Sequence, residues 1–252
     1  MKLLTLARDL RRRRARERQQ LFVAEGVRAV EELLSSPIPV RGVLVAPKLA
    51  DTPRGSALLD AARRRGVDVT NVDEREFASA AETDSPQGVL AIAEIPVRRL
   101  EDTQLPEHAR VVALDGVQDP GNVGTILRTA AALEAAAVLA MPGTVDLWNA
   151  KVVRSAMGAL FHAPTFMTTW PELDTFRTRH SMALWGADAG GTPLERLQPP
   201  ERLALLVGNE GSGLSSEGRA RVEQSVSIPI GSAVESLNVA VATGIILYQL
   251  RP

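Results

Sequence analysis

The 252-residue sequence lacks cysteine altogether and contains only three histidines. The absence of cysteine excludes disulfides, thiolate nucleophiles, iron–sulfur clusters and every zinc site that needs a thiolate. The histidines, His108, His162 and His180, lie far apart and do not have the HExxH spacing of a zinc site. Metal chemistry is therefore not expected, and we interpret the histidines as surface or packing residues.

Long apolar runs are also missing from the sequence. About five apolar residues precede Arg8, which is too few for the core of a signal peptide. No segment approaches the roughly 20 apolar residues of a membrane span. With 45% hydrophobic and 23% charged residues, the composition is typical of a soluble globular protein, and the length favours two domains. We expect a cytoplasmic protein with no membrane partner.

The net charge of -1 conceals an uneven distribution along the chain. Residues 1–65 hold 15 basic and 7 acidic residues, a net charge of +8, whereas the remainder carries -9. Leucines at helical spacing accompany a dense run of arginines between positions 8 and 18. Codon bias is another explanation of the high arginine content. For the basic segment itself, the alternative to nucleic-acid contact is a solvated surface, but such surfaces mix the two signs of charge more evenly. We predict a basic helix that contacts nucleic acid through Arg11, Arg12, Arg13, Arg14 and Arg18.

Strands and helices alternate along the chain in two blocks. In the first block, strands are predicted at 22–26, 41–46, 67–70 and 87–95, which indicates a small α/β domain over residues 1–95. Residues 96–108 contain two prolines and mixed charges, the composition of a linker. The second block has predicted strands at 111–115, 136–141, 182–187, 203–208 and 225–230, and helices near 146–157, 170–179, 216–223 and 236–250. This pattern predicts a mostly parallel sheet covered by helices on both faces.

Three loops near the ends of these strands carry the candidate chemistry, because open parallel sheets bind ligands beyond the carboxyl ends of their strands. In the segment 119–129, Asn122 is a candidate helix cap and Arg128 lies about two turns into the helix. This segment has GxxG instead of GxGxxG, so dinucleotide binding is poorly supported. The segment 206–215 is glycine-rich without the lysine of a phosphate-binding loop. It can hold an adenine, a ribose or a phosphate, or it can be a structural turn.

The third loop leads into the last predicted helix. Ser236 is a candidate cap for this helix, and Asn238 lies in its first turn. Beyond these two residues the helix is apolar on nearly every face. Such a helix must be buried, and we expect part of it to pack against another subunit.

Together these segments resemble the motifs of the SpoU (TrmH-like) RNA ribose methyltransferases of the SPOUT superfamily. The three family motifs match, in chain order, Asn122, Gly124, Arg128 and Thr129; Gly208, Glu210 and Gly213; and Ser236, Leu237, Asn238 and Val239. Residues 8–34 and 85–96 resemble the L30e-like RNA-binding domain that precedes the catalytic domain in many of these enzymes. The resemblance spans almost the whole chain and is densest at 111–135 and 203–250.

The resemblance implies methyl transfer from S-adenosylmethionine to a ribose 2′-hydroxyl of RNA by a homodimer. Ribosomal RNA is the first choice of substrate and transfer RNA the second. The implied fold is α/β: a small L30e-like substrate-binding domain over residues 1–95, a linker over 96–108, and a trefoil-knot (SPOUT) catalytic domain over 109–252 with a mostly parallel sheet. A metal is not required for this reaction.

The resemblance also implies a role for each site residue. Arg128 lies at the reacting ribose, where we favour positioning and electrostatic help, because an arginine with a pKa above about 12 holds its proton strongly. Glu210 holds or polarises Arg128. The hydroxyl and the loops are oriented by Asn122, Ser236 and Asn238. The cofactor lies against Gly208, Ile228 and Leu237, with the loop near Ala187 beside it.

Three alternatives stay open at this point. A non-catalytic RNA-binding protein could keep the fold, although the motif residues Arg128, Glu210, Ser236 and Asn238 are all present. A nucleotide-dependent oxidoreductase lacks GxGxxG and an acidic ribose-binding partner at the expected spacing. A base-methylating relative is disfavoured by Arg128 and the Ser-Leu-Asn motif.

Overall fold

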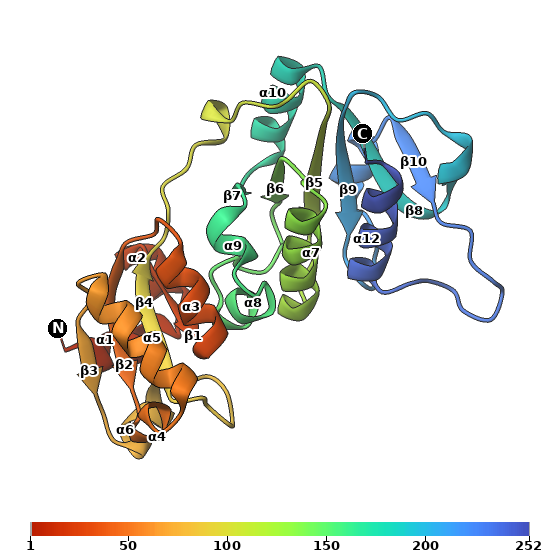
Figure 1. The fold of residues 1–252 in the computed structure, drawn as a ribbon. Helices are drawn as coiled ribbons and strands as arrows, with labels where there is room; N and C mark the ends of the chain where they lie inside the picture. Colours follow the sequence, from red (N-terminus) through yellow and green to blue (C-terminus); the bar gives the residue numbers. More distant parts are fainter. Residues whose placement is uncertain (1, 252) are drawn as a thin grey trace. The chain divides into compact units, whose positions relative to one another are not determined.

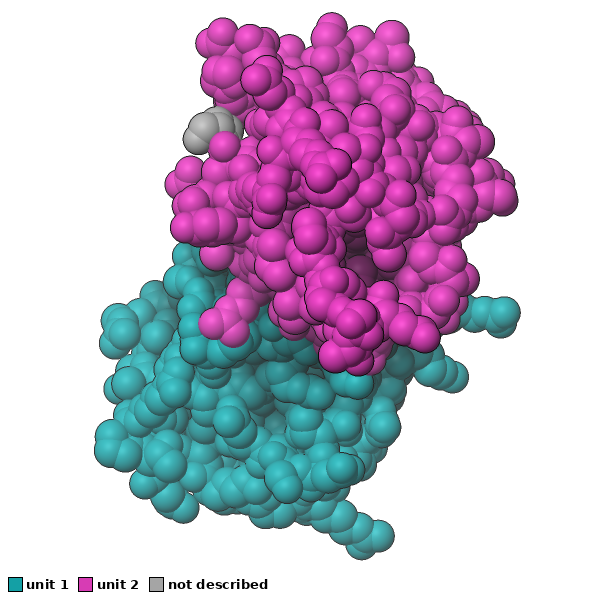
Figure 2. Space-filling model, turned by 90° about the vertical axis from the view of Figure 1, so that its right-hand side faces the viewer, with its two compact units in different colours: residues 1–97, 148–162 teal, residues 98–147, 163–252 magenta. Residues whose placement is uncertain are grey.

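The structure, a computed structural model, describes residues 2–251 (Figure 1). The chain forms two compact units, which Figure 2 shows in different colours. The first unit comprises the chain through Val97 together with Trp148–His162. The second unit comprises Arg98–Leu147 and the chain from Ala163 onward. A segment from the middle of the chain is therefore part of the N-terminal unit.

The first unit is built on a four-stranded mixed sheet in the order β1-β4-β2-β3. Its strands are β1 (Leu21–Glu25), β2 (Val40–Val45), β3 (Val69–Asn71) and β4 (Val89–Glu94). β4 pairs antiparallel with both β1 and β2, whereas β2 and β3 are parallel. All five residues of β1 and the first five of β4 are buried, because helices and the neighbouring strands enclose them.

Helices complete this unit. They are α1 (Leu3–Leu10), α2 (Arg13–Gln19), α3 (Val27–Ser35), α4 (Pro47–Ala50), α5 (Pro53–Arg64) and α6 (Glu74–Ala80). The prediction of one basic helix is wrong, because the chain breaks at Arg11 and Arg12 between α1 and α2. Arg16, 4% exposed, stabilises the break by donating hydrogen bonds to the carbonyl oxygens of Leu10 and Arg11.

The segment 148–162 packs into the first unit through aromatic contacts. It holds two short helices, α8 (Ala150–Ser155) and α9 (Ala159–His162). The ring of Phe22 on β1 lies 4.6 Å from that of Trp148 and 5.8 Å from that of Phe161, centroid to centroid. Gly158 has a φ of +94°, and a Cβ there would lie 2.7 Å from Glu32, so this approach to α3 requires glycine.

The second unit is built on a six-stranded parallel sheet in the order β10-β8-β9-β5-β6-β7. Its strands are β5 (Ala109–Asp115), β6 (Ala137–Ala140), β7 (Thr165–Met167), β8 (Ala183–Pro193), β9 (Arg202–Gly208) and β10 (Gln224–Ser227). Every residue of β5 is buried, as expected for a central strand covered on both faces. The predicted α/β class with a mostly parallel sheet is confirmed.

Four helices accompany this sheet: α7 (Pro120–Ala132), α10 (Trp170–His180), α11 (Ser216–Arg221) and α12 (Val239–Gln249). Single 3-10 turns lie at Leu100–Asp102 and Leu194–Arg196. Buried side chains of α10 pack with alternate residues of β5, β6 and β9 in one hydrophobic cluster. α12 packs along α7 (Figure 1). Among the described residues, no helix is long and apolar enough to cross a membrane.

Candidate active site

The carboxyl ends of β5 and β9 lie side by side and form the base of the candidate site. Asp115 at the end of β5 is in register with Gly208 at the end of β9. The Asp115 side chain is 3% exposed, and its Oδ2 accepts a 2.7 Å hydrogen bond from the backbone N–H of Ser215. This bond ties the far end of the glycine-rich loop to the neighbouring strand.

Asn209 folds the glycine-rich loop back on itself. Its Oδ1 accepts hydrogen bonds from the backbone N–H groups of Gly211 and Ser212, at 3.0 and 3.1 Å. Its Nδ2 donates a 2.9 Å hydrogen bond to the carbonyl oxygen of Gly116, just after β5. The turn is tight enough that a Cβ on Gly208 would lie 2.2 Å from the carbonyl carbon of Gly213. Position 208 therefore accepts only glycine.

Glu210 extends from this loop to the start of α7. Its Oε1 accepts hydrogen bonds from the Asn122 side-chain amide at 3.0 Å and from the backbone N–H of Asp119 at 3.1 Å. Its Oε2 accepts from the backbone N–H of Gln118 at 3.3 Å. A carboxylate at a helix start is stabilised by the unpaired N–H groups and by the helix dipole.

These donors also set the protonation of Glu210. Partial burial alone would raise the pKa of this carboxyl. Hydrogen bonds from the Asn122 side chain and from the N–H groups of Glu210, Asp119 and Gln118 outweigh burial and lower the pKa below its ordinary value. Glu210 is thus a carboxylate at neutral pH and acts as a hydrogen-bond acceptor.

Asn238 connects the start of α12 to the same network. As the N-cap of α12, its Oδ1 accepts hydrogen bonds from the N–H groups of Ala240 and Val241. Its Nδ2 donates a 2.9 Å hydrogen bond to Oδ1 of Asn122. The structure therefore brings Glu210, Asn122 and Asn238 together from three distant segments.

Two predicted helix caps are wrong. Asp119 caps α7, since its side chain accepts a hydrogen bond from the N–H of Asn122, so Asn122 lies inside the first turn. The cap of α12 is Asn238, and Ser236 lies in the preceding loop. In both cases a nearby Asp or Asn takes the cap, because its side-chain oxygen reaches the first free N–H groups.

A cavity of about 510 Å³ adjoins this network in the second unit. The four residues predicted to contact the cofactor, Ala187, Gly208, Ile228 and Leu237, all line it. So do Glu210, Ser236 and Asn238. The wall combines apolar side chains such as Val207 and Ile246 with the polar edge of the glycine-rich loop. This mixture suits a ligand with an aromatic ring and several polar groups.

Arg128 lies on an exposed part of α7, six residues beyond Asn122. It does not belong to the cavity lining. Arg128 and Glu210 are connected through the helix, because Glu210 binds the first turn of the helix that carries Arg128. α7 therefore sets the position of Arg128 relative to the cavity.

Sequence reasoning missed an ion pair in the cavity wall. Nη1 of Arg219 lies 2.5 Å from Oδ2 of Asp188, and both residues line the cavity. The backbone N–H of Gly190 and the Arg219 guanidinium hold the pKa of Asp188 below its ordinary value. Asp188 directly follows the predicted strand 182–187 and Asp115 ends the predicted strand 111–115, but neither belongs to a motif. Among the described residues, no three His, Asp or Glu side chains could hold a metal ion together.

The predicted RNA-contacting arginines all lie at the break between α1 and α2 or on α2. Several of them contact neighbouring acidic groups. Asp9 pairs with both Arg12 and Arg18, and Arg13 pairs with Glu17. Nη1 of Arg11 donates a hydrogen bond to the carbonyl oxygen of Ser79. These surface pairs are weak, so phosphate groups can compete for the same guanidinium groups.

Comparison with known proteins agrees with this geometry. Residues 109–248 match the model of the SpoU rRNA Methylase family, and residues 5–91 match the MRM3-like substrate binding domain. The chain is 34% identical to the 23S rRNA (guanosine(2553)-2′-O)-methyltransferase RlmP of Bacillus subtilis, over 97% of this chain and 94% of that protein.

Solved structures share the fold of this chain. The SpoU methyltransferase AviRb from Streptomyces viridochromogenes, in complex with the cofactor AdoMet, has a TM-score of 0.89 at 28% identity, covering 99% of this chain and 97% of that one. An AdoMet-bound rRNA methyltransferase from Sinorhizobium meliloti has a TM-score of 0.86 at 28% identity, covering 99% and 94%. The resemblance seen in the three motifs is confirmed, and the chain belongs to the SpoU rRNA methylase family.

Proposed function

We propose that this protein transfers a methyl group from S-adenosylmethionine to a ribose 2′-hydroxyl of ribosomal RNA. The observation that carries the proposal is the Glu210–Asn122–Asn238 network at the edge of a cavity of about 510 Å³. It joins all three family motifs in one place. Two of the relatives named above, RlmP and the Sinorhizobium meliloti protein, are rRNA methyltransferases by name, which favours ribosomal over transfer RNA.

S-adenosylmethionine fits the cavity by its chemistry. Ile228 and Leu237 offer apolar surface to the adenine and the methionine chain, and Gly208 lines the same wall without a side chain. Ala187 lies at the same wall, next to Asp188. When bound, the cofactor supplies an electrophilic methyl on a sulfonium. The protein's task is then to bring a 2′-hydroxyl in line with that methyl and to exclude water.

We assign Arg128 to the reacting ribose. Its guanidinium stays protonated at neutral pH, so it positions the hydroxyl or an adjoining phosphate and stabilises negative charge that develops on the attacking oxygen. Glu210 and Asn122 hold the first turn of α7, and Asn238 fixes the start of α12 beside it. Ser236, which lines the cavity in the preceding loop, orients the hydroxyl.

We assign RNA binding and catalysis to different parts of the chain. We assign RNA binding to residues 1–95, with Arg11, Arg12, Arg13, Arg14 and Arg18 at its basic surface, and catalysis to residues 109–252, with 96–108 as the linker. The match of residues 5–91 to a substrate binding domain and of 109–248 to the methylase family supports this division. Because ribosomal RNA is the proposed substrate, we place the protein in the cytoplasm.

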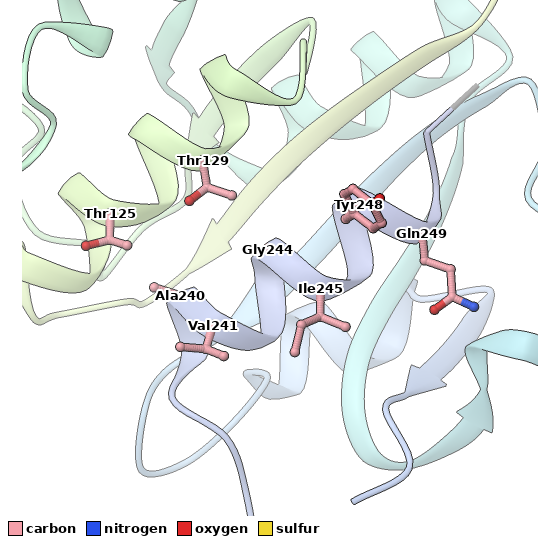
Figure 3. Close-up of a pocket in the computed structure, with 8 residues that line it drawn as sticks. All are labelled: Thr125, Thr129, Ala240, Val241, Gly244, Ile245, Tyr248 and Gln249. Carbon is pink, nitrogen blue, oxygen red and sulfur yellow. The ribbon is translucent and has the colours of Figure 1, made fainter.

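An apolar face on α7 and α12 supports a homodimer. Thr125, Thr129, Gly244, Ile245 and Tyr248 line a shallow hollow on this face (Figure 3). Val241, Ile245 and Tyr248 are 51%, 40% and 60% exposed in the single chain. The helix predicted to be buried thus leaves an apolar face that a second copy can cover. Light scattering should give about twice the chain mass of 27.0 kDa; a fully active monomer would contradict the dimer.

The proposed activity is tested with Arg128→Ala. The wild-type protein should transfer label from S-adenosylmethionine to 23S rRNA, and the variant should lose turnover while its cofactor affinity stays within a few fold. Loss of cofactor binding would mean that the role of Arg128 is misassigned. Cofactor binding without any transfer by the wild type, to ribosomal or transfer RNA, would favour the non-catalytic alternative.

A further inference from the structure

Another cavity, of about 240 Å³, lies within the first unit. The junction of β1 with α3, the loop before β4 and the end of α8 line it. None of its residues belongs to the motifs that identify the family. Among the described residues that line it, six have polar or charged side chains: Glu25, Arg28, Thr83, Ser85, Gln87 and Arg154.

Arg154 supplies a buried donor that has no acceptor. Its Nη1 is shielded from solvent and has no hydrogen-bond partner within the part of the chain that the structure describes. A buried polar group without a partner costs free energy, so proteins almost always satisfy such groups. Because Arg154 is part of the cavity wall, a ligand that offers an oxygen acceptor would satisfy this nitrogen.

The charge of the wall points to an anion. Among the described lining residues, Glu25 is the one acidic side chain beside Arg28 and Arg154. Outside the lining, Glu31 also interacts electrostatically with Arg28, which helps to lower the pKa of Glu31. Glu25 is 3% exposed, and its carboxylate already accepts hydrogen bonds from the N–H of Glu82 and the hydroxyl of Thr83. The lining thus has two guanidinium groups and one carboxylate, and that carboxylate is already hydrogen-bonded. The cavity therefore has an excess of positive charge and of hydrogen-bond donors.

The cavity is also fixed in shape. Oε1 of Gln87 accepts a 2.8 Å hydrogen bond from the N–H of Val27 and so ties the loop before β4 to the start of α3. Gly26 has a φ of +100°, and a Cβ there would lie 3.1 Å from that same oxygen. The bond from Val27 and a 3.0 Å bond from the N–H of Gly26 to the carbonyl oxygen of Val89 hold the backbone at this corner, which favours a preformed binding site.

We propose that this cavity binds a backbone phosphate of the substrate RNA through Arg154 and Arg28, an inference that rests on the proposed function. Guanidinium groups bind phosphate oxygens with charge-assisted, often paired hydrogen bonds. A base is the less suitable occupant, since the described lining includes no aromatic side chain on which a base could stack. Arg154 comes from the methylase part of the sequence, so the site joins that part to the substrate-binding fold within one unit.

The test compares the variants Arg154→Ala, Arg154→Lys and Arg28→Ala with Arg64→Ala, an exposed arginine on α5 that does not line the cavity. Binding of 23S rRNA is measured by filter binding across a salt series. Loss of one phosphate contact should weaken binding about fivefold or more and flatten the log-log salt slope by about one unit. Arg154→Lys should recover part of the affinity, and Arg64→Ala should match the wild type.

Two further readouts distinguish an RNA phosphate site from a structural arginine and from a site for free phosphate. Cofactor affinity should be unchanged in Arg154→Ala. The melting temperature should not fall, because the substitution removes an unpartnered buried donor; a purely structural role would instead lower it. If inorganic phosphate raises the melting temperature of the wild type but not of Arg154→Ala, while RNA binding is the same in both, the cavity binds free phosphate and the RNA assignment is wrong.

The proposal and the proposed function fail in different ways. Unchanged RNA affinity and salt slope in both Arg154→Ala and Arg28→Ala, with methyl transfer intact, would overturn the phosphate site alone. Absence of methyl transfer by the wild type would overturn the proposed function. If Arg154→Ala does not fold, the RNA affinity and salt slope of Arg28→Ala and Arg154→Lys test the phosphate site instead.

Discussion

The side-chain amide of Asn238 donates a 2.9 Å hydrogen bond to the side-chain oxygen of Asn122. Asn122 in turn donates a 3.0 Å hydrogen bond to Glu210. The two side-chain amides thus connect the three motifs by hydrogen bonds, which hold the starts of α7 and α12 to the glycine-rich loop.

Asn238 performs two tasks that two substitutions can separate. Asn238→Ala removes both the cap and the bridge, so it should destabilise the protein by about 1 kcal/mol and reduce methyl transfer. Asn238→Asp keeps an oxygen for the cap but loses the donor to Asn122, so it should unfold near the wild-type temperature and still lose at least about tenfold in turnover. Thermal unfolding and transfer assays measure the two effects. Full activity in Asn238→Asp would show that the bridge is not needed.

Glu210 should make stability depend on pH in acid. Because its pKa is lowered in the folded protein, the carboxylate contributes stability that is fully present above the unfolded pKa of about 4.3. That contribution is lost as the pH falls through the lower folded value. Melting temperatures of the wild type and Glu210→Gln, measured from neutral pH to about pH 3, should therefore converge in acid. Parallel curves would mean that Glu210 is not stabilised as a carboxylate.

Gly208 should tolerate no side chain. Gly208→Ala places a Cβ 2.2 Å from the backbone of Gly213, which must open the loop that forms one wall of the cavity. We expect cofactor binding, measured by calorimetry, to weaken by at least about tenfold, or 1.4 kcal/mol. Gly231→Ala is the matched control, since a Cβ at this position meets no atom within 4 Å. Equal cofactor affinity in both variants would contradict the assignment of the cavity.

The basic surface of α1 and α2 should act in RNA capture. Replacing Arg11, Arg12, Arg13 and Arg14 with Gln should flatten the log-log slope of RNA affinity against salt by up to about three to four units. The change is smaller if some of these arginines stay paired with an acidic neighbour in the wild-type complex and never contact phosphate. Cofactor binding should be untouched. Arg16 is left in place because it is buried and supports the backbone. Unchanged slope and affinity would mean that this surface is only solvated.

Sequence patterns predicted the parts of the fold that depend on local periodicity. The apolar run of β5 predicted a fully buried strand, and the structure buries all seven of its residues. The three motifs lie near strand ends, so a parallel sheet necessarily brings them to one edge. The resemblance of the motifs to the family assigned Glu210, Asn122 and Asn238 to one site, whereas their hydrogen bonds to one another were not predicted.

Other features depend on contacts that local patterns do not encode. β7 has only three residues, too few for a recognisable alternation. The break between α1 and α2 is supported by Arg16, which reads in the sequence as one more exposed arginine. The packing of residues 148–162 into the first unit rests on rings far apart in the chain, such as Phe22 and Trp148. The cavity around Arg154 follows from that packing and could not be predicted for the same reason.

The most direct test of the proposed function is the position of the transferred methyl group. Purified protein is incubated with labelled S-adenosylmethionine and 23S rRNA without added metal, and the product is hydrolysed in alkali. A methyl on the ribose blocks cleavage of the adjoining phosphodiester, because the 2′-oxygen can no longer attack it. We predict that the label appears in an alkali-resistant dinucleotide; label on a base, or none on RNA, would contradict ribose methylation.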